Sequence, residues 1–572
     1  MNKIFKYSLF IFLVFITIFL RLFLVTKSPA RLTNDEMSIG YNAYSILKTG
    51  KDEWGKSFPL IFKAFGDYKL PAYIYLTVPF LAIFDLNDFS VKVPSIIAGF
   101  MIVFYVYKLT LLVFQDKKLA YLAAFICAVS PWGVEISRQA REANLALMFF
   151  IMGIYYLLLS QKSDNKKYAI ISSLFLALTF YTYVAYRLII GFLGIYLIFD
   201  FFSKKDKFKK YQYNLISFLL FIIPISFYLF NSAGTSRFNA VSIFKDESIA
   251  ARVTDSMNFC FLKNNAKYFQ YMCKLFFNSL IYLFKDFSHN YAASLLPKFL
   301  FMEGSPENHL SFLGFGEFFM ILLPFYLLGL FRLFKEKANY QNNILKAIFF
   351  IAPIPSALTG PPHPLRASIL YPFISIIIGL GLIQFYHFIK MMMAKYILTV
   401  FFSLIFIFYF LDFYLNYFLI YPLKYDNANF YFDSKNLVSY IKNIENDYEK
   451  IYIDKDFADA YIALAFYNKI DPKYLQKNII RSDQDGIGFT HPVQLGKYYF
   501  TGRTLSDLLC YSNTQDLFLT ARQENMPNKT FIEFKNFSQV HAQARIYDIE
   551  KIKEFYRSNY NNVNYNGSRL AL

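Results

Sequence analysis

Apolar segments long enough to cross a lipid bilayer recur along most of this sequence. A spanning helix needs about 20 mostly apolar residues to cross a hydrocarbon core of roughly 30 Å. Only 17% of the residues are charged, against about 25% in a water-soluble globule. The sequence therefore predicts a polytopic α-helical membrane protein with about eleven transmembrane helices. We expect spans near residues 4–26, 91–114, 119–134, 143–160, 168–185, 187–202, 212–230, 312–333, 345–359, 367–389 and 396–420.

The lysines between these segments predict the orientation of the chain, because basic residues collect in cytoplasmic loops. A cytoplasmic N-terminus puts five basic stretches on that side, so the net charge of +19 does not indicate nucleic-acid binding. The opposite loops, residues 135–142, 185–187 and 359–366, contain arginines and no lysine. The five stretches are Lys117 and Lys118; Lys162, Lys166 and Lys167; Lys204, Lys205, Lys207, Lys209 and Lys210; Arg332, Lys335 and Lys337; and Lys390 and Lys395.

Two short segments leave the path of the chain open. Residues 70–84 are apolar but contain Pro71 and Pro79, which predicts a re-entrant or interfacial helix. The segment 119–134 is almost as short. If the first spans and the second does not, Lys117 and Lys118 change sides and every later loop keeps its side.

The sequence predicts two domains. Residues 1–420 form a transmembrane domain with outer loops at 27–69 and 231–311, and residues 421–572 form a soluble extracytoplasmic α/β domain. In this tail, segments 450–456, 530–537 and 544–549 alternate as strands do, and 460–470 is typical of a helix. Cys260 and Cys273 in the second loop can form a disulfide if that loop faces an oxidising compartment.

The first outer loop contains the clearest candidate for acid–base chemistry. Thr33 and Glu36 have the spacing of a capping box, and Gly50 ends the apolar stripe that follows. This pattern predicts an amphipathic helix over residues 31–50, lying on the membrane surface. Asp35 is outside the box. Its carboxylate is either a favourable charge at the helix N-terminus or a base for a hydroxyl.

Arginines mark the other outer loops. Arg138, Arg141 and Glu142 lie between two spans. Arg138 and Glu142 have the spacing of an ion pair on one helix face. Arginine is also the preferred side chain for binding phosphate, so these residues are alternatively donor contacts. The turn at residues 357–370 presents His363 and Arg366. The outer rim also contains Arg187, typical of an interface anchor. The long second loop offers the further candidates Glu303, Asn308 and His309.

Other catalytic motifs are absent from the sequence. It contains no phosphate-binding Gly-rich loop, no HExxH and no histidine cluster. Two Asp-x-Asp strings, at 454–456 and 483–485, follow predicted strands and are typical of polar turns. The sequence therefore indicates no metal site, although a divalent metal remains an alternative.

The combination of these features resembles the GT-C membrane glycosyltransferases. The sequence is most similar to glycosyltransferase family 39, which includes protein O-mannosyltransferases and the aminoarabinose transferases of lipid A. The resemblance covers roughly residues 1–390. It depends on Asp35-Glu36, KLPAYIYL (69–76), QAREANLA (139–146) and GPPHPLRA (360–367). Gln139 and Ala146 replace a histidine and an acid of the mannosyltransferase pattern, and the tail has no Trp-Trp-Asp motif.

This resemblance implies an inverting glycosyltransferase of the bacterial plasma membrane that acts in glycosylation of the cell envelope. It implies a sugar donor linked to polyprenyl phosphate, an acceptor hydroxyl on a glycan, lipid or protein, and an active site on the outer face. Asp35 would be the catalytic base and Glu36 its supporting neighbour. The expected donor phosphate contacts are Arg138, Arg141, Arg366, His363, Arg187 and Lys69, and the expected acceptor or sugar contacts are Glu142, Glu303, Asn308 and His309.

The main alternative is a lipid or solute transporter or flippase. Such proteins place ionisable residues within their spans. Here the charges concentrate at the outer rim, and we expect Arg21, inside the first span, to reach the outer interface by snorkelling. We expect no cofactor to be required, membrane lipids as the surroundings and no nucleic-acid partner.

Overall fold

The computed structural model describes residues 3–29, 32–64, 67–163, 165–202, 208–229, 242–263, 267–305, 314–335, 340–424, 434–457, 460–484, 490–511, 515–520, 531–535 and 542–559. The chain divides into two compact units. The helical unit contains Met1–Val25, Leu70–Tyr73 and Lys92–Tyr417. The sheet unit contains Thr26–Lys69, Ile74–Val91 and Phe418–Leu572, so the first outer loop groups with the C-terminal segment.

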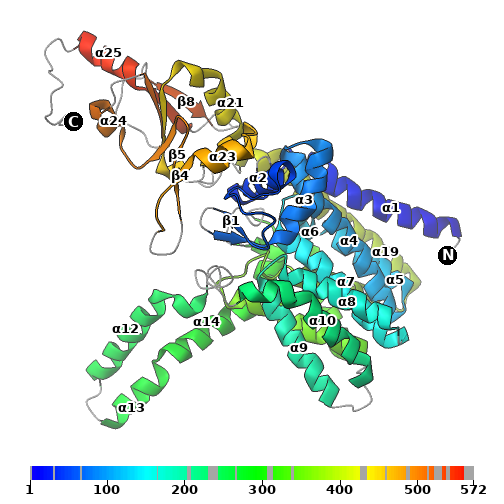
Figure 1. The fold of residues 1–572 in the computed structure, drawn as a ribbon. Coiled ribbons are helices and arrows are strands. Elements are labelled where there is room, and N and C mark those ends of the chain that lie inside the picture. The colour runs from blue at the N-terminus through cyan, green and yellow to red at the C-terminus, as the bar shows by residue number, and fades with distance from the viewer. Residues whose placement is uncertain are drawn as a thin grey trace. The chain divides into compact units, whose positions relative to one another are not determined.

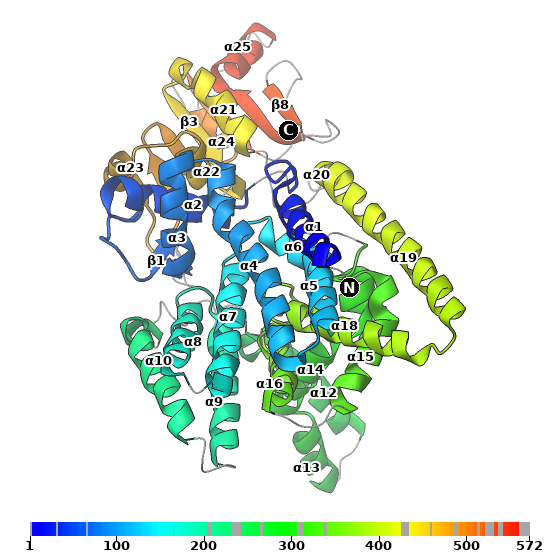
Figure 2. The same ribbon diagram turned by 90° about the vertical axis from the view of Figure 1, so that its right-hand side faces the viewer.

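Helices make up the regular structure of the helical unit (Figures 1 and 2). They are α1 Lys3–Leu22, α4 Asp88–Phe114 (whose first turn is in the sheet unit), α5 Lys117–Val129, α6 Pro131–Ser137, α7 Glu142–Ser163, α8 Lys166–Phe180, α9 Ala185–Phe202, α10 Phe208–Leu229, η2 Ile243–Lys245, α12 Glu247–Lys263, α13 Lys267–Phe276, α14 Ser279–Ala293, η3 Lys298–Glu303, η4 Met320–Leu322, α15 Leu323–Lys335, α16 Tyr340–Ile351, α17 Ile354–Ala357, α18 Leu370–Phe388, α19 Met392–Leu415 and η5 Asn416–Ile420 (whose end, from Phe418, is in the sheet unit).

Among the described residues, four helices are long and apolar enough to cross a membrane. They are Asp88–Phe114, Glu142–Ser163, Leu370–Phe388 and Met392–Ile420. Shorter apolar helices cover Tyr7–Leu22, Pro71–Phe84, Ala185–Ile198 and Gln212–Tyr228. The chain is thus an integral membrane protein by helix composition, and the count of eleven crossings stays a prediction.

The predicted span at 119–134 is wrong as a continuous helix. Helix α5 ends at Val129 and α6 starts at Pro131, with a bend of 58° between them. Pro131 has no N–H to continue α5, and Ser130 instead caps the new helix by accepting the Gly133 N–H at 3.1 Å. If the two helices together form one span, the described residues contain up to five spans.

Small residues allow close packing within the helical unit. A Cβ atom on Gly381 of α18 would lie 1.7 Å from the Phe325 carbonyl oxygen of α15, and one on Gly329 would lie 1.8 Å from the Ile377 carbonyl oxygen. Helices in lipid associate through such backbone approach, because lipid chains are as apolar as leucine. Helices α12 and α14 run side by side (Figure 1), and the disulfide between Cys260 and Cys273, with Cα atoms 6.0 Å apart, joins α12 to α13. The sequence left this pairing open, and the structure contains the disulfide.

The sheet unit combines the first outer loop with an α/β segment. Its described elements are α2 Asn34–Thr49, β1 Phe62–Ala64, β2 Asp67–Lys69, α3 Pro71–Phe84 (whose first turn is in the helical unit), α20 Tyr421–Lys424, α21 Ser434–Ile444, η7 Glu445–Asp447, β3 Lys450–Asp454, η8 Lys455–Phe457, α22 Ala460–Tyr467, α23 Pro472–Asn478, β4 Ile479–Arg481, β5 Pro492–Leu495, β6 Tyr498–Thr501, α24 Leu505–Tyr511, β7 Asp516–Thr520, β8 Phe531–Lys535, β9 Ala542–Asp548 and α25 Ile549–Asn559.

Strands β3 to β9, as far as the structure describes them, form one mixed sheet in the order β4-β5-β6-β3-β7-β9-β8. Strand β3 pairs in parallel with β6 and β7, and the other pairs are antiparallel. Leucines of α24 and isoleucines of α25 pack with Phe518 and Tyr547 in a core under the sheet. The strands predicted in the tail and the helix at 460–470 are confirmed as β3, β8, β9 and α22.

Helix α2 does not lie on a membrane surface as predicted. Its capping box and its left-handed C-cap at Gly50 are present. From Glu36 to Ala43 the helix is buried on all sides, however, and α22 and α23 pack against it, whereas Leu47 near its end is 37% exposed. A Cβ atom on Gly40 would lie 2.6 Å from atoms of both Phe466 and Val91. The covering helix is 400 residues away in sequence, so the amphipathic pattern alone could not reveal it.

Candidate active site

The Asp-Glu pair at the start of α2 divides into a structural and a more accessible carboxylate. Glu36 is buried, accepts the Thr33 N–H at 2.8 Å and receives the reciprocal cap from the Thr33 hydroxyl. Asp35 is 49% exposed at its side chain. The accessible member of the pair is therefore the one predicted to be the base.

Lys69 is the ion-pair partner of Asp35. Its ammonium lies 2.5 Å from Asp35 Oδ1, and its side chain is only 1% exposed. The β1–β2 hairpin, in which Lys69 pairs with Phe62, carries this ammonium to the start of α2. Burying an ammonium is costly unless a carboxylate compensates it. Lys69, predicted to contact phosphate, therefore holds Asp35 in position in this structure.

A second acid in the sheet unit was missed by sequence reasoning. Glu53 is fully buried, and the Tyr461 hydroxyl donates to its carboxylate at 3.3 Å. Burial raises the pKa of Glu53 to about 7, with a further rise from Asp52 and a partial offset from Arg481. The guanidinium of Arg481 lies 3.6 Å from the centroid of the Trp54 ring. Tyr461 and Arg481 come from the tail, so no local pattern could have indicated this cluster.

Arg138 has a structural place in the helical unit. Its guanidinium donates to the carbonyl oxygens of Leu20 and Phe23, both at 2.7 Å, and lies over the Tyr417 ring. The side chain is fully buried, so it closes the end of α1 rather than facing a ligand. Two expectations are corrected by this structure. Arg138 ends α6 and Glu142 begins α7, so the two residues do not lie on one helix face. The guanidinium of Arg138 is buried against carbonyl oxygens, so it does not face a donor phosphate.

Arg21 is also buried instead of snorkelling. Its guanidinium donates to the carbonyl oxygens of Thr17 at 3.3 Å and Ala128 at 3.1 Å. A carbonyl of α5 is within reach because α1 packs against that helix. Arg21 thus holds two helices together in place of reaching the interface.

Arg141 lies in the short turn between α6 and α7, where it is half-buried. Its Nε donates to Gln139 Oε1 at 2.8 Å, and its Nη2 donates to the same oxygen. Gln139 replaces the histidine of the family pattern, and here its amide oxygen orients the guanidinium. Glu142 is the first residue of α7, where a carboxylate is favoured by the helix dipole.

The turn before α18 holds His363 and Arg366 in a fixed backbone. The His363 N–H donates to Ser356 Oγ at 3.0 Å, and His363 Nδ1 accepts the Leu365 N–H at 3.2 Å. A neutral ring with Nδ1 as acceptor carries its proton on Nε2. Arg366 is half-buried, and its Nη1 donates to the Thr359 carbonyl at 3.2 Å.

Three segments that are far apart in sequence meet within the helical unit. Trp132 of α6 is fully buried, and its indole N–H donates to the Pro364 carbonyl at 3.2 Å, in the turn that bears Arg366. The hydroxyl of Tyr186, which precedes Arg187 in α9, lies 3.2 Å from the Ser368 hydroxyl. These two contacts join α6 and the start of α9 to the segment 364–368, which contains Arg366.

The remaining candidates lie elsewhere or outside the described residues. Glu303 ends η3 and pairs with Lys298 at 3.3 Å, with both side chains exposed. Asn308 and His309 lie outside the described residues. Asp454 is buried and accepts the Thr520 hydroxyl at 2.8 Å, which is a structural contact within the sheet. In the described part of the chain, no three His, Cys, Asp or Glu residues are grouped as metal ligands would be.

The fold defines a class of membrane protein: a helical unit whose loops carry arginines, and a second unit with a mixed sheet. Residues 69–229 match the model of the dolichyl-phosphate-mannose-protein mannosyltransferase family. No curated protein sequence matches the chain.

Solved structures extend this likeness over most of the chain. The structure of ArnT from Cupriavidus metallidurans bound to undecaprenyl phosphate matches with a TM-score of 0.51 at 10% identity, covering 96% of this chain and 98% of that one. The archaeal oligosaccharyltransferase AglB from Archaeoglobus fulgidus, in complex with an inhibitory peptide and a dolichol-phosphate, matches with a TM-score of 0.50 at 15% identity over 81% of this chain. This chain spans 64% of the length of that oligosaccharyltransferase. The chain therefore has the fold of the GT-C membrane glycosyltransferases.

Proposed function

We propose that this protein is an inverting glycosyltransferase that moves a sugar from a polyprenyl-phosphate donor to an acceptor hydroxyl on the outer face of the membrane. The observation that carries the proposal is the meeting of arginine-bearing loops in a unit with the GT-C fold. Arginine binds phosphate with two parallel hydrogen bonds, and its charge stabilises a leaving phosphate. The fold alone is compatible with several activities, so the arginines are the stronger argument.

The proposed topology has a cytoplasmic N-terminus, eleven crossings and the soluble C-terminal domain outside the cell, in the plasma membrane of a bacterium. The disulfide between Cys260 and Cys273 supports an outer location for the second loop, because disulfides persist in oxidising compartments. Nucleotide sugars are cytosolic, so a site on the outer face needs a sugar already carried across on a lipid. The likeness to ArnT bound to undecaprenyl phosphate supports a polyprenyl-phosphate donor.

In the proposed reaction the acceptor oxygen attacks the anomeric carbon of the sugar. Asp35 takes the proton of the acceptor hydroxyl, and Lys69 orients the Asp35 carboxylate. The bond between the anomeric carbon and the phosphate oxygen breaks, with its electron pair leaving on the phosphate, and attack from the opposite face inverts the configuration. The departing phosphate is neutralised by Arg141 and Arg366, assisted by Arg187 and His363.

This assignment requires no divalent metal, because the guanidinium groups supply the positive charge that a metal would supply. The acceptor is a hydroxyl of a glycan, lipid or protein. We expect transfer to continue at an unchanged rate in excess EDTA, measured as released polyprenyl phosphate. A loss that returns with Mg²⁺ or Mn²⁺ would contradict this part of the proposal.

The deciding experiment incubates the purified protein with a panel of polyprenyl-phosphate sugars and measures released polyprenyl phosphate. We expect Asp35→Asn to lower this rate by about 10² to 10⁴, the usual contribution of a general base. The matched control is Asp85→Asn, because Asp85 is an exposed acid of the same unit that pairs with Lys469. Normal turnover by the Asp35 variant would show that another group is the base.

A further inference from the structure

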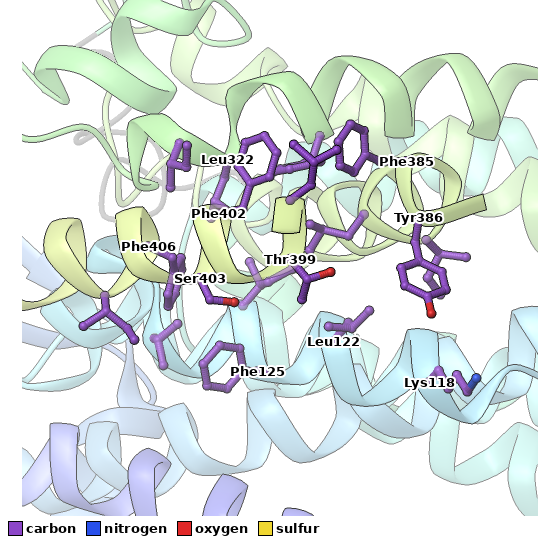
Figure 3. Close-up of a pocket in the computed structure, with 18 of the residues that line it drawn as sticks. Lys118, Leu122, Phe125, Leu322, Phe385, Tyr386, Thr399, Phe402, Ser403 and Phe406 are labelled. Carbon is purple, nitrogen blue, oxygen red and sulfur yellow. The ribbon is translucent and has the colours of Figure 1, made fainter. Parts of the chain in front are cut away.

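An apolar cavity of about 990 Å³ lies within the helical unit, between α19 and the helices α1, α5 and α18. Phenylalanine, leucine and isoleucine side chains line most of it, including Phe125, Phe402 and Phe406 (Figure 3). None of the arginines of the outer loops lines this cavity. It is therefore separate from the site proposed for the sugar donor.

Helix α19 forms one side of this cavity, and most of the helix surface is exposed to the surrounding lipid. Its apolar stretch is among the longest of the described spans, yet only 6% of it is buried by the rest of the chain. Figure 2 shows α18 and α19 meeting at one end and diverging from it. The Phe402 ring of α19 packs edge-on against the Phe325 ring of α15, with 5.2 Å between the ring centroids. This contact holds α19 at one side of the cavity. Protein interiors contain few voids larger than a water molecule, so an apolar space of this size between membrane helices favours lipid chains as its filling.

One end of the cavity is basic. Lys117, Lys118 and His387 line it, and the ammonium of Lys395 lies 4.7 Å from the centroid of the Tyr386 ring, which also lines it. Lys118 and Tyr386 are at one end in Figure 3, and Phe406 is toward the other. This end is the N-terminus of α5, whereas Arg138 lies at the far end of the α5–α6 pair.

Among the described residues that line the cavity, Asp116 is the one acid. Asp116 lines the cavity, but its carboxylate caps α5 by accepting the N–H groups of Lys118 at 2.8 Å and Leu119 at 3.2 Å. The three lysines therefore leave a positive charge at the mouth of an apolar slot. This arrangement is complementary to an amphiphile with an anionic head and apolar chains.

We propose that the cavity binds an anionic phospholipid, with its acyl chains along α19 and its phosphate among Lys117, Lys118 and Lys395. In the proposed topology these lysines are on the cytoplasmic side, where anionic lipids are abundant and attract basic residues. The bound lipid replaces the missing protein contacts of α19 and holds this helix against the bundle. The inference does not depend on the transfer reaction, because binding is measured without any sugar.

The headgroup is tested by native mass spectrometry of the delipidated full-length protein with dioleoyl phosphatidylglycerol or dioleoyl phosphatidylcholine. We expect phosphatidylglycerol to bind at least about tenfold more tightly, since each lysine near a lipid surface contributes about fivefold. Lys117→Gln/Lys118→Gln/Lys395→Gln should lose this preference while binding of phosphatidylcholine stays unchanged. The matched control, Lys162→Gln/Lys166→Gln/Lys167→Gln, removes three lysines that do not line the cavity and should keep the preference.

The acyl-chain site is tested by filling the cavity from α19. Ser403 lines it and points into it in Figure 3, whereas the next residue, Leu404, is 62% exposed and does not line it. Ser403→Trp should therefore abolish binding of both lipids, and Leu404→Trp should leave binding unchanged. The proposal is overturned if the wild type binds both lipids equally, if the triple lysine variant keeps its preference, or if Ser403→Trp still binds. Displacement of phosphatidylglycerol by an equal concentration of undecaprenyl phosphate would identify a different occupant and also overturn it.

Discussion

The end of α1 and the turn before α18 both contain arginines of the helical unit, yet their surroundings differ. At the end of α1, Arg21 and Arg138 are fully buried, and carbonyl oxygens accept their N–H groups. In the turn before α18, Arg366 is half-buried and bonds to one carbonyl, that of Thr359. A guanidinium has five donors. Arg21 Nε and Nη2 are buried without a hydrogen-bond partner, so exposure separates the two regions. The buried arginines of the first region hold helices, whereas the half-buried Arg366 has donors that a ligand can reach.

This difference predicts that Arg138→Ala changes stability more than chemistry. The substitution leaves the carbonyls of Leu20 and Phe23 buried without their charged donor, which should cost about 3 to 5 kcal/mol. The measurement is the thermal unfolding midpoint of the purified protein in detergent. Arg138→Lys can still reach one carbonyl and should lose less. If Arg138→Ala unfolds like the wild type but releases no polyprenyl phosphate, the two regions do not differ as proposed.

Arg366→Ala should show the opposite behaviour. In the proposed reaction Arg366 neutralises the leaving phosphate, so its removal should lower kcat by about 10² to 10³, which corresponds to about 3 to 4 kcal/mol. The unfolding midpoint should stay within a degree or two of the wild type, because Arg366 is half-exposed. Arg366→Lys keeps the charge but loses the fork geometry, so it should recover only part of the rate. A large loss of stability in Arg366→Ala would remove the contrast between the two regions.

Glu53 in the sheet unit is a buried acid, so its charge state should affect stability as the buried arginines do. Its pKa is raised to about 7 from a usual value of 4.5, mainly by burial. Between these two pH values the folded protein keeps a proton that the unfolded chain loses, so the stability from Glu53 is present below pH 4.5 and is lost as the pH rises to about 7. The expected loss is roughly 3 kcal/mol.

Glu53→Gln should abolish this part of the pH dependence, because glutamine resembles the protonated acid. The measurement is the difference between the unfolding midpoints of wild type and variant from pH 4.5 to pH 8. Glu449→Gln, at an exposed acid of the same unit, is the control and should follow the wild type. A variant that keeps the full pH dependence would show that Glu53 is ionised in the folded protein.

Local patterns in the sequence predicted local structure well. The capping box at Thr33 and Glu36 and the strands of the tail depend on neighbouring residues. The family resemblance predicted the fold that the structural matches show. Each of these features can be read from composition, spacing or a motif.

The predictions that failed concern contacts between distant segments. The pattern of α2 is the same whether lipid or α22 covers it, and only the fold supplies α22. Arg138 and Arg141 are three residues apart in sequence, and only the position of α1 makes the first of them buried. Likewise, Tyr461 and Arg481 affect Glu53 from more than 400 residues away. The candidate site was thus predicted as a set of loops, and the sequence could not assign each arginine its role.

A substitution of Gln139 tests whether Arg141 binds the donor, because Gln139 contacts the Arg141 guanidinium. This prediction has the smallest expected effect. Both donors of Arg141 that Gln139 accepts are on one edge of the guanidinium, so the amide oxygen fixes the orientation of the fork. Gln139→Ala should therefore raise the KM for the polyprenyl-phosphate donor by about tenfold, near 1.4 kcal/mol, with little change in kcat. Gln139→Glu keeps an acceptor oxygen in place and should restore most of the affinity. If both variants instead lower kcat and leave KM unchanged, Arg141 acts in the transition state alone, and the orienting contact from Gln139 serves catalysis rather than donor binding.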